Sequence, residues 1–285
     1  MISLASVSFR YDNILNLSAT LNEYKIGWWL GLPATSGSKY FYNLFDINHG
    51  TLTGFATSSS GWRGSTRPGG YVGLKLNGDG DYVSVDDSTK FQFANTNFSV
   101  SCWFMLETLN NPNSNGRQTV VSRYESASSK GFSIDIDTTG SIIFRVAESA
   151  VLFGEYASAG STISIDTWYH CLVVRQGIAS FVYLNGRLVA SGASASTLNI
   201  SSGSQNMLFG DMVTNGGGRQ YLKGYIDDVC IYNTSLTSYL GQRIFNESRT
   251  DYPTTLNKIY VNRAFSIAAP WLYFNMLQNA YGVTL

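Results

Sequence analysis

Alternating apolar and polar positions predict antiparallel strands in the middle of the chain. Residues 168–176 alternate with a period of two, which is the period of a β-strand. A second run, residues 178–184, is rich in aromatic and β-branched side chains. Asn185 and Gly186 follow it, and an Asn-Gly pair readily takes the positive φ that both central positions of a type I′ turn require. Residues 167–192 are therefore predicted to contain a tight β-hairpin.

The same pattern recurs along most of the chain. Turn signals at 110–116, 138–140 and 215–218 separate the runs, and no segment of useful length has a helical period. Many short strands at roughly 8–12-residue spacing indicate an all-β sandwich or barrel. Strands are expected near residues 72–77, 80–86, 96–107, 117–124, 131–137, 141–147, 150–156, 168–176, 178–185, 187–191, 205–210 and 221–233.

One short helix is expected after the last strand. Thr237 can serve as its N-cap, and Leu240 and Ile244 have the i,i+4 apolar spacing of a helix. The pattern divides the chain into an extended N-terminal arm at 1–25, a strand-rich domain at 26–250, and a C-terminal tail at 251–285. The arm has no basic segment followed by a continuous apolar run, so it does not resemble a signal peptide.

The tail is strongly apolar, and such a segment marks an interaction site when it is exposed. Pro270 excludes one long helix, so we expect an extended segment near 258–268 and a short helix or turn at 271–278. We predict that the tail docks on the sandwich itself or on another chain. Its large apolar residues are Ile259, Val261, Phe265, Ile267, Trp271, Leu272, Tyr273, Phe274, Met276, Leu277 and Tyr281.

Composition narrows the classes of partner. Only 13% of residues are charged and the formal net charge is zero, so the basic footprint of a nucleic-acid-binding protein is absent. No apolar run approaches the ~20 residues of a membrane span. Cys102, Cys171 and Cys230 lie in predicted strands, and we expect buried free thiols and assembly in a reducing compartment.

Six segments, taken in order, resemble the laminin-G-like family of concanavalin A-like jelly rolls, over roughly residues 26–248. The resemblance implies a two-sheet antiparallel jelly-roll sandwich with one short helix and extended N- and C-terminal arms. Side chains expected to be buried are Trp103, Leu172, Val174, Phe181, Ile226 and Val229. The matching segments are GWW at 27–29, DINHGTL at 46–52, LNGDGDYV at 76–83, FSVSCW at 98–103, WYH…YLNG at 168–186 and GYIDDVCIYN at 224–233.

The resemblance also implies a structural Ca²⁺ site, because members of the family often carry calcium near the sheet rim. Asp46 and Asn48 match the family's metal-binding loop, and Asp227 lies in the last strand. Calcium takes six to eight oxygen ligands at ~2.3–2.6 Å. The loop is shorter than the family pattern. The alternative is that Asp46 and Asp227 accept backbone hydrogen bonds and clamp the first loop to the last strand.

Candidate glycan contacts are aromatic and planar polar side chains in predicted rim loops: Trp62, Arg63, Asn215, Arg219 and Tyr221. The small, polar and glycine-rich segment 53–70 is expected to be an exposed loop. The alternative for Trp62 is that it folds back onto the edge of the sandwich.

Catalytic patterns are missing from the sequence. Retaining glucanases of this fold carry an E-x-D-x-E type of strand, because retaining chemistry needs two carboxyls ~5–5.5 Å apart. Asp135 and Asp137 alternate without a glutamate partner, and we expect them on the solvated face of an edge strand. His170 resembles a packed structural residue of the family, and G-x-S-x-G is absent. We therefore expect a non-enzymatic protein.

These features favour a virion structural protein of a tailed phage, either a surface decoration or a fibre-like component. It would be made in the host cytoplasm, and its arm and tail would contact neighbouring virion proteins or second copies of the chain. The jelly roll would face outward, where it can touch host glycans. The alternative is a carbohydrate-binding or adhesive module of a bacterial surface system, outside the cell or on its surface. A glycoside-active enzyme is disfavoured by the missing carboxylate pattern.

Overall fold

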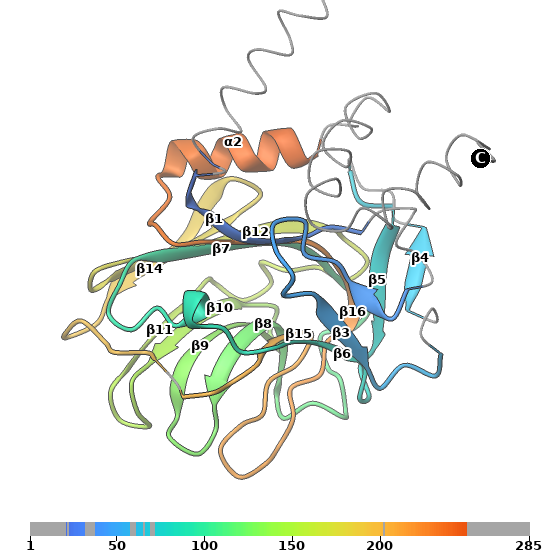
Figure 1. The fold of residues 1–285 in the computed structure, drawn as a ribbon, viewed down its shortest axis with the longest axis horizontal. Coiled ribbons are helices and arrows are strands. Elements are labelled where there is room, and N and C mark those ends of the chain that lie inside the picture. Colours follow the sequence, from blue (N-terminus) through green and yellow to red (C-terminus); the bar gives the residue numbers. More distant parts are fainter. Residues whose placement is uncertain are drawn as a thin grey trace, which may run out of the picture.

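Two antiparallel sheets lie face to face in the computed structural model, which describes residues 21, 23–31, 38–57, 61–64, 66–68, 72–201 and 203–249 (Figure 1). One α-helix is labelled in Figure 1, α2 (Ser238–Ser248), and it covers the outer side of one sheet. This arrangement confirms the predicted all-β sandwich with one short helix. The predictions for residues 1–20 and for the tail 251–285 lie outside the described residues.

Both sheets have eight strands. The first sheet runs in the order β14 (Arg187–Ala193), β13 (Ala179–Leu184), β12 (Tyr169–Gln176), β7 (Phe98–Leu106), β16 (Lys223–Tyr232), β5 (Val72–Asn77) and β4 (Trp62–Gly64), and β1 (Lys25–Trp29) also pairs with β16. The second sheet runs in the order β11 (Phe153–Ala157), β10 (Ile142–Ala147), β9 (Lys130–Asp137), β8 (Arg117–Glu125), β15 (Met207–Phe209), β6 (Tyr82–Val85), β3 (Gly50–Thr53) and β2 (Tyr40–Phe41).

The strands predicted between residues 72 and 233 are present, with ends that shift by a few residues. The segment 53–70 differs from the prediction, because Trp62–Gly64 forms the edge strand β4 and pairs with β5 rather than lying in a continuous loop. A short 3-10 helix, η2 (Thr89–Phe91), connects β6 to β7. In the described part of the chain, no helix is long and apolar enough to cross a membrane.

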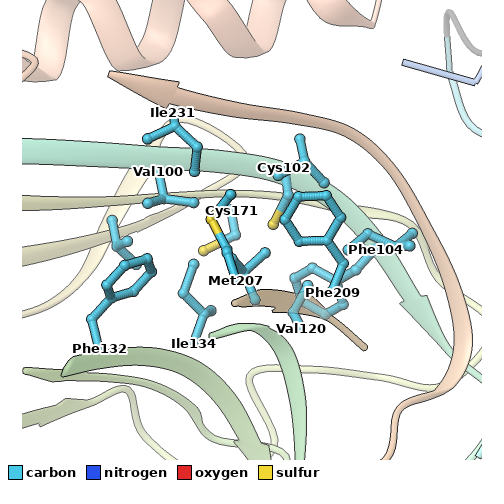
Figure 2. Close-up of a cluster of buried hydrophobic side chains, with 14 of the residues drawn as sticks. Val100, Cys102, Phe104, Val120, Phe132, Ile134, Cys171, Met207, Phe209 and Ile231 are labelled. Carbon is cyan, nitrogen blue, oxygen red and sulfur yellow. The ribbon is translucent and has the colours of Figure 1, made fainter. Parts of the chain in front are cut away.

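The core lies between the sheets. Figure 2 shows Cys102 of β7 and Cys171 of β12 in one cluster with Phe132 of β9 and Phe209 of β15. Both cysteines are buried and free, as is Cys230, which confirms the prediction of buried thiols. Alternation therefore works as expected, because each strand directs every second side chain into this layer.

A smaller apolar cluster occupies the opposite face of the first sheet, where Leu172 and Val174 pack near Leu240 and Ile244 of α2. Phe181 packs against this outer cluster and is partly buried, so it is more exposed than the other side chains predicted to be buried. The side chains whose burial is confirmed are Trp103, Leu172, Val174, Ile226 and Val229.

Local sequence signals account for the hairpin and the helix. Asn185 and Gly186 have φ of 51° and 78° between β13 and β14, as the predicted type I′ turn requires. Thr237 caps α2, and its side-chain oxygen accepts a hydrogen bond of 3.3 Å from Leu240 N. Both predictions are confirmed.

Candidate functional site

A cleft of about 410 Å³ opens on the outer face of the second sheet. Three neighbouring strands form its floor, and a hairpin at residues 212–220, which leads into β16, forms one wall. Its lining mixes planar polar groups, two arginines and an aromatic ring. The lining residues are Asn115, Gly116, Arg117, Tyr124, Asp135, Arg145, Met212, Thr214, Asn215 and Gln220.

Strand alternation and one bulge place these side chains on the outer face. Ile134 and Ile136 of β9 enter the core, so Asp135 between them faces outward. The register of β8 against β9 shifts between Thr119 and Val121. This bulge adds one residue to β8, so the side chains after it point to the face opposite to the one that strict alternation would give. Tyr124 therefore lies on the outer face together with Arg117.

Backbone hydrogen bonds join the hairpin 212–220 to β8 and to the residues just before it. Thr119 N donates to Gln220 O at 3.0 Å, and Asn115 N donates to Arg219 O at 2.8 Å. Val213 and Arg219 form an isolated bridge within the hairpin. Met212, Thr214 and Gln220 consequently face the cleft, whereas the Arg219 side chain is on the opposite side of the hairpin.

Glu155 of β11 joins the two arginines of the cleft. Arg117 Nη1 and Nη2 donate to Glu155 Oε2 and Oε1 at 2.9 and 2.7 Å, a bidentate pair. These hydrogen bonds lower the pKa of Glu155. Arg145 Nη1 lies 3.6 Å from Glu155 Oε2. The Arg145 guanidinium also lies 4.6 Å from the ring centroid of Phe153 and 5.7 Å from that of Tyr124.

Asp135 is fully buried beneath the cleft. The Thr119 and Ser133 hydroxyls each lie 2.7 Å from its carboxylate oxygens, and burial raises its pKa against these hydrogen bonds. The expectation of a solvated edge-strand position is wrong for Asp135, because β9 lies between β8 and β10 and Gln220 of the hairpin reaches Thr119 above it. Asp137, at the end of β9, accepts hydrogen bonds from Thr139 and Ser141 N.

The structure brings some of the predicted glycan-contacting residues to this region. Asn215 lines the cleft, and its side-chain nitrogen donates to the Ser129 hydroxyl. Arg219 is paired with Asp211 and lies 5.1 and 5.2 Å from the rings of Tyr82 and Tyr221. Arg219 and Tyr221 therefore lie beside the cleft, behind its hairpin wall.

The other two predicted residues are on a different part of the molecule. Trp62 is only 6% exposed, because its ring packs edge-on against Phe41 and its Nε1 donates to Ser38 O at 2.8 Å. The prediction that Trp62 offers an exposed contact is thus corrected in favour of the folded-back alternative. Arg63 is exposed on β4, where its Nη1 donates to Trp62 O at 2.8 Å.

The first two candidate calcium ligands have other partners. Asp46 forms an ion pair with Lys90 and accepts from Ile47 N at 2.5 Å. Burial would raise the pKa of Asp46, but Lys90 and the Ile47 amide together lower it. The backbone oxygen of Asn48 accepts from Trp29 Nε1 at 3.1 Å. Asp46 therefore already has a cation beside it.

Asp227, the third candidate ligand, is fully buried in β16. Its Oδ1 accepts from Gly31 N at 2.8 Å, and its Oδ2 accepts from Arg67 Nε at 2.8 Å. These donors fit a clamp between the end of the first strand and the last strand, and they do not fit a calcium ion held jointly with Asp46. The described residues contain no group of three or more His, Cys, Asp and Glu side chains arranged for a metal. Calcium binding stays a prediction.

Sequence reasoning missed most of the cleft. Arg117, Tyr124, Arg145 and Gln220 were not among the predicted contacts. The outward positions of the first three in the strands predicted at 117–124 and 141–147 could have marked them as candidates. The sequence alone does not show which of those strands the hairpin covers.

Residues 77–239, more than half of the chain, match the family described as the concanavalin A-like lectin/glucanases superfamily. No curated protein matches the sequence.

Several solved structures share the fold at low sequence identity. The binding domain of Paraclostridial Mosquitocidal Protein 1 has a TM-score of 0.61 and 15% identity over 80% of this chain and 53% of that one. The botulinum neurotoxin serotype D binding domain has a TM-score of 0.58 and 15% identity over 81% and 52%. The same domain in complex with N-acetylneuraminic acid has a TM-score of 0.58 and 16% identity over 81% and 52%. The chain thus spans about half the length of these proteins, and the likeness is one of fold.

Proposed function

Because the chain belongs to the concanavalin A-like lectin/glucanase superfamily, we propose that it is a non-enzymatic, lectin-like module that binds carbohydrate in the cleft on its second sheet. The family match agrees with the motifs that carried the sequence resemblance. The fold hosts several functions, so the proposal depends on the site rather than on the family alone.

One observation carries the proposal: the cleft places the Tyr124 ring among the planar polar groups of Arg145, Asn215 and Gln220. The C–H faces of a sugar ring are apolar and pack on an aromatic ring, while its hydroxyls need planar donors and acceptors at the edges. The volume of about 410 Å³ falls within the ~300–1,000 Å³ of small-molecule sites. The cleft therefore has the size and chemistry to hold a short glycan.

The carboxylates of the cleft support binding rather than hydrolysis. Asp135 is fully buried and accepts hydrogen bonds from two hydroxyls, and Glu155 is held by the bidentate pair with Arg117. A glycosidase needs one carboxyl that can donate a proton to the glycosidic oxygen and a second that can reach the sugar. Neither carboxylate is presented in that way.

The test is a glycan array probed with the full chain, followed by titration of the best ligand. Tyr124→Ala removes the stacking surface and is expected to lower affinity by at least about tenfold, given the ~1.4 kcal/mol that corresponds to this factor. Tyr239→Ala is the matched control, since Tyr239 is an exposed tyrosine on α2. Unchanged affinity in Tyr124→Ala, or no glycan binding by the intact chain, would contradict the proposal.

We further propose that the domain is displayed on a surface, as a component of a tailed-phage virion. The support is the apolar sequence of residues 251–285, which suits an anchor to neighbouring proteins or to other copies of the chain. The alternative is a carbohydrate-binding or adhesive module of a bacterial surface system. A similar structure that is described as a toxin receptor-binding domain supports this alternative. A virion protein and a secreted adhesin differ in their partners.

A truncation that ends at Thr250 tests the anchoring role. The truncated chain is expected to remain folded, with the far-ultraviolet circular dichroism of a β protein, and to lose its place in the assembly that the full chain joins. Sedimentation or purified-particle composition measures the loss. Full occupancy of the assembly by the truncated chain would contradict the anchor. Association with secreted or cell-surface proteins, rather than with particle proteins, would favour the adhesive module.

A further inference from the structure

The charges around the cleft are balanced. Arg117 and Arg145 are the cations that line it, and their anionic neighbours are Glu155 and Asp135. Arg117 Nη2 lies 2.7 Å from Glu155 Oε1, and Arg117 Nη1 lies 4.0 Å from Asp135 Oδ2. Asp137 also acts electrostatically on Arg117 and Glu155. The carboxyl groups therefore at least match the two cations, and there is no surplus of positive charge for an acidic ligand to neutralise.

Glu155 occupies the position that a ligand carboxylate would need. It lies between the two guanidiniums, with a bidentate bond to Arg117 and Arg145 Nη1 at 3.6 Å. A planar carboxylate–guanidinium pair is the usual way in which proteins bind acidic groups. A sialic acid carboxylate or a sulfate would have to displace Glu155, or lie beside it and be repelled by like charge.

Arg145 remains available to a neutral ligand. Its Nε is buried and has no hydrogen-bond partner among the described residues, so a ligand can reach only its terminal nitrogens. The Glu155 oxygen nearest to Nη1 is 3.6 Å away, which is longer than a hydrogen bond. The guanidinium keeps its place through the rings of Phe153 and Tyr124. Sugar hydroxyls can accept from its terminal N–H groups without adding a charge to the cleft.

We propose that the cleft selects neutral glycans and that Glu155 is the specificity-determining residue that excludes acidic ones; this inference rests on the proposed carbohydrate binding. The Glu155 carboxylate occupies the position between Arg117 and Arg145 that the anionic group of an acidic glycan would otherwise take. The botulinum neurotoxin serotype D domain, which was solved in complex with N-acetylneuraminic acid, is about twice as long as the matched region.

The experiment compares neutral glycans with their sialylated and sulfated counterparts on one array, using the full chain. The wild-type chain is expected to prefer the neutral member of each pair by at least about tenfold. Its affinity for the neutral ligand should be nearly constant between about 50 and 500 mM salt, because no ion pair forms with the ligand.

Glu155→Gln keeps the shape of the side chain and removes its charge, so the ratio of acidic to neutral binding is expected to rise by about tenfold or more. Glu247→Gln is the control, since Glu247 also pairs with an arginine, Arg243 Nε at 3.0 Å, but lies on α2 away from the cleft. Thermal melting of both variants checks that the fold is intact, and the salt series on the wild-type chain supplies a readout that needs no variant.

The outcomes separate this inference from the function on which it rests. Equal or better binding of acidic glycans by the wild-type chain overturns the selectivity and leaves carbohydrate binding in place. A wild-type preference that Glu155→Gln does not change overturns the role of Glu155. No binding of any glycan overturns the proposed function, and the selectivity with it.

Discussion

Arg67 reaches the buried carboxylate of Asp227, with its Nε 2.8 Å from Oδ2, and both side chains are almost fully shielded from solvent. The same guanidinium donates from Nη1 to Ser248 O at 2.9 Å, at the C-terminal end of α2. Trp103 Nε1 donates to the Ser248 hydroxyl at 3.0 Å, and Arg67 lies 5.2 Å from the Trp103 ring. Arg67 therefore links the segment at residues 66–68 to β16 through the ion pair and to α2 through the hydrogen bond.

Arg67→Met is expected to destabilise the domain by about 3–5 kcal/mol near pH 8, because it leaves the Asp227 carboxylate buried without its cation. Burial raises the pKa of Asp227 to about 6, with Arg67 opposing the rise. This folded-state pKa is higher than the ordinary value of 3.8. The contribution of Asp227 to stability is therefore fully present below pH 3.8 and is lost as the pH rises through about 6. In the variant without Arg67, the loss of stability between low pH and pH 8 should be larger than in the wild type.

Urea unfolding at pH 8 and pH 4.5 measures this effect. The destabilisation by Arg67→Met should be smaller at pH 4.5, where the carboxyl is protonated in both variants. Arg243→Met, which removes an exposed i,i+4 pair on α2, should change stability by under about 1 kcal/mol at either pH. An equal loss at both pH values would show that Arg67 acts by packing alone.

The contribution of His170 to folding stability depends on pH in the opposite direction. It is buried beside Trp103, with ring centroids 5.5 Å apart, and burial lowers its pKa to about 4, which Asp228 opposes and Arg67 reinforces. A depressed pKa means that stability is fully present above pH 6.5 and is lost as pH falls through about 4. His170→Phe should therefore gain about 2–3 kcal/mol relative to the wild type on going from pH 7.5 to pH 4.5. Denaturant titrations at the two pH values check the gain, and a pH-independent difference would contradict it.

The fold was predictable because its signals are local. The alternation at 168–176 and the Asn185–Gly186 turn involve neighbouring residues, and both elements formed as predicted. The Thr237 cap is equally local. Such signals depend on backbone preferences that the rest of the chain does not have to supply.

The cleft was less predictable because it depends on distant residues and on one irregularity. Arg117 and Glu155 are 38 residues apart and meet only through the pairing of β8, β9, β10 and β11. A strict period of two from Thr119 would place Tyr124 in the core, and the bulge before Val121 reverses that placement. The burial of Trp62 likewise depends on a contact with Ser38 that no local pattern shows.

Calcium dependence can be measured directly. Asp46 lies against Lys90, and both oxygens of Asp227 accept hydrogen bonds, so we expect the melting temperature to be unchanged by added calcium or by a chelator. A calcium-dependent rise that is lost in Asp46→Asn would instead establish a site in the loop at residues 46–52. Lys90→Met supplies the control, because it removes the competing cation and should strengthen any such site.

Gly241 tests how closely α2 approaches the first sheet. Alanine is favoured over glycine in a helix by about 1 kcal/mol, so propensity alone predicts that Gly241→Ala is stabilising. A Cβ at this position would lie 2.5 Å from Cδ2 of Leu172, which is itself buried under the helix. Overpacking of this kind costs about 1–3 kcal/mol, so after the propensity gain we expect a net loss of up to about 2 kcal/mol in denaturant unfolding. Gln242→Ala, at the adjacent exposed position, should be neutral or slightly stabilising. Leu172→Val removes the clashing methyl and should recover part of the loss in a double variant. A Gly241→Ala chain more stable than the wild type would mean that α2 can move away from β12 at little cost.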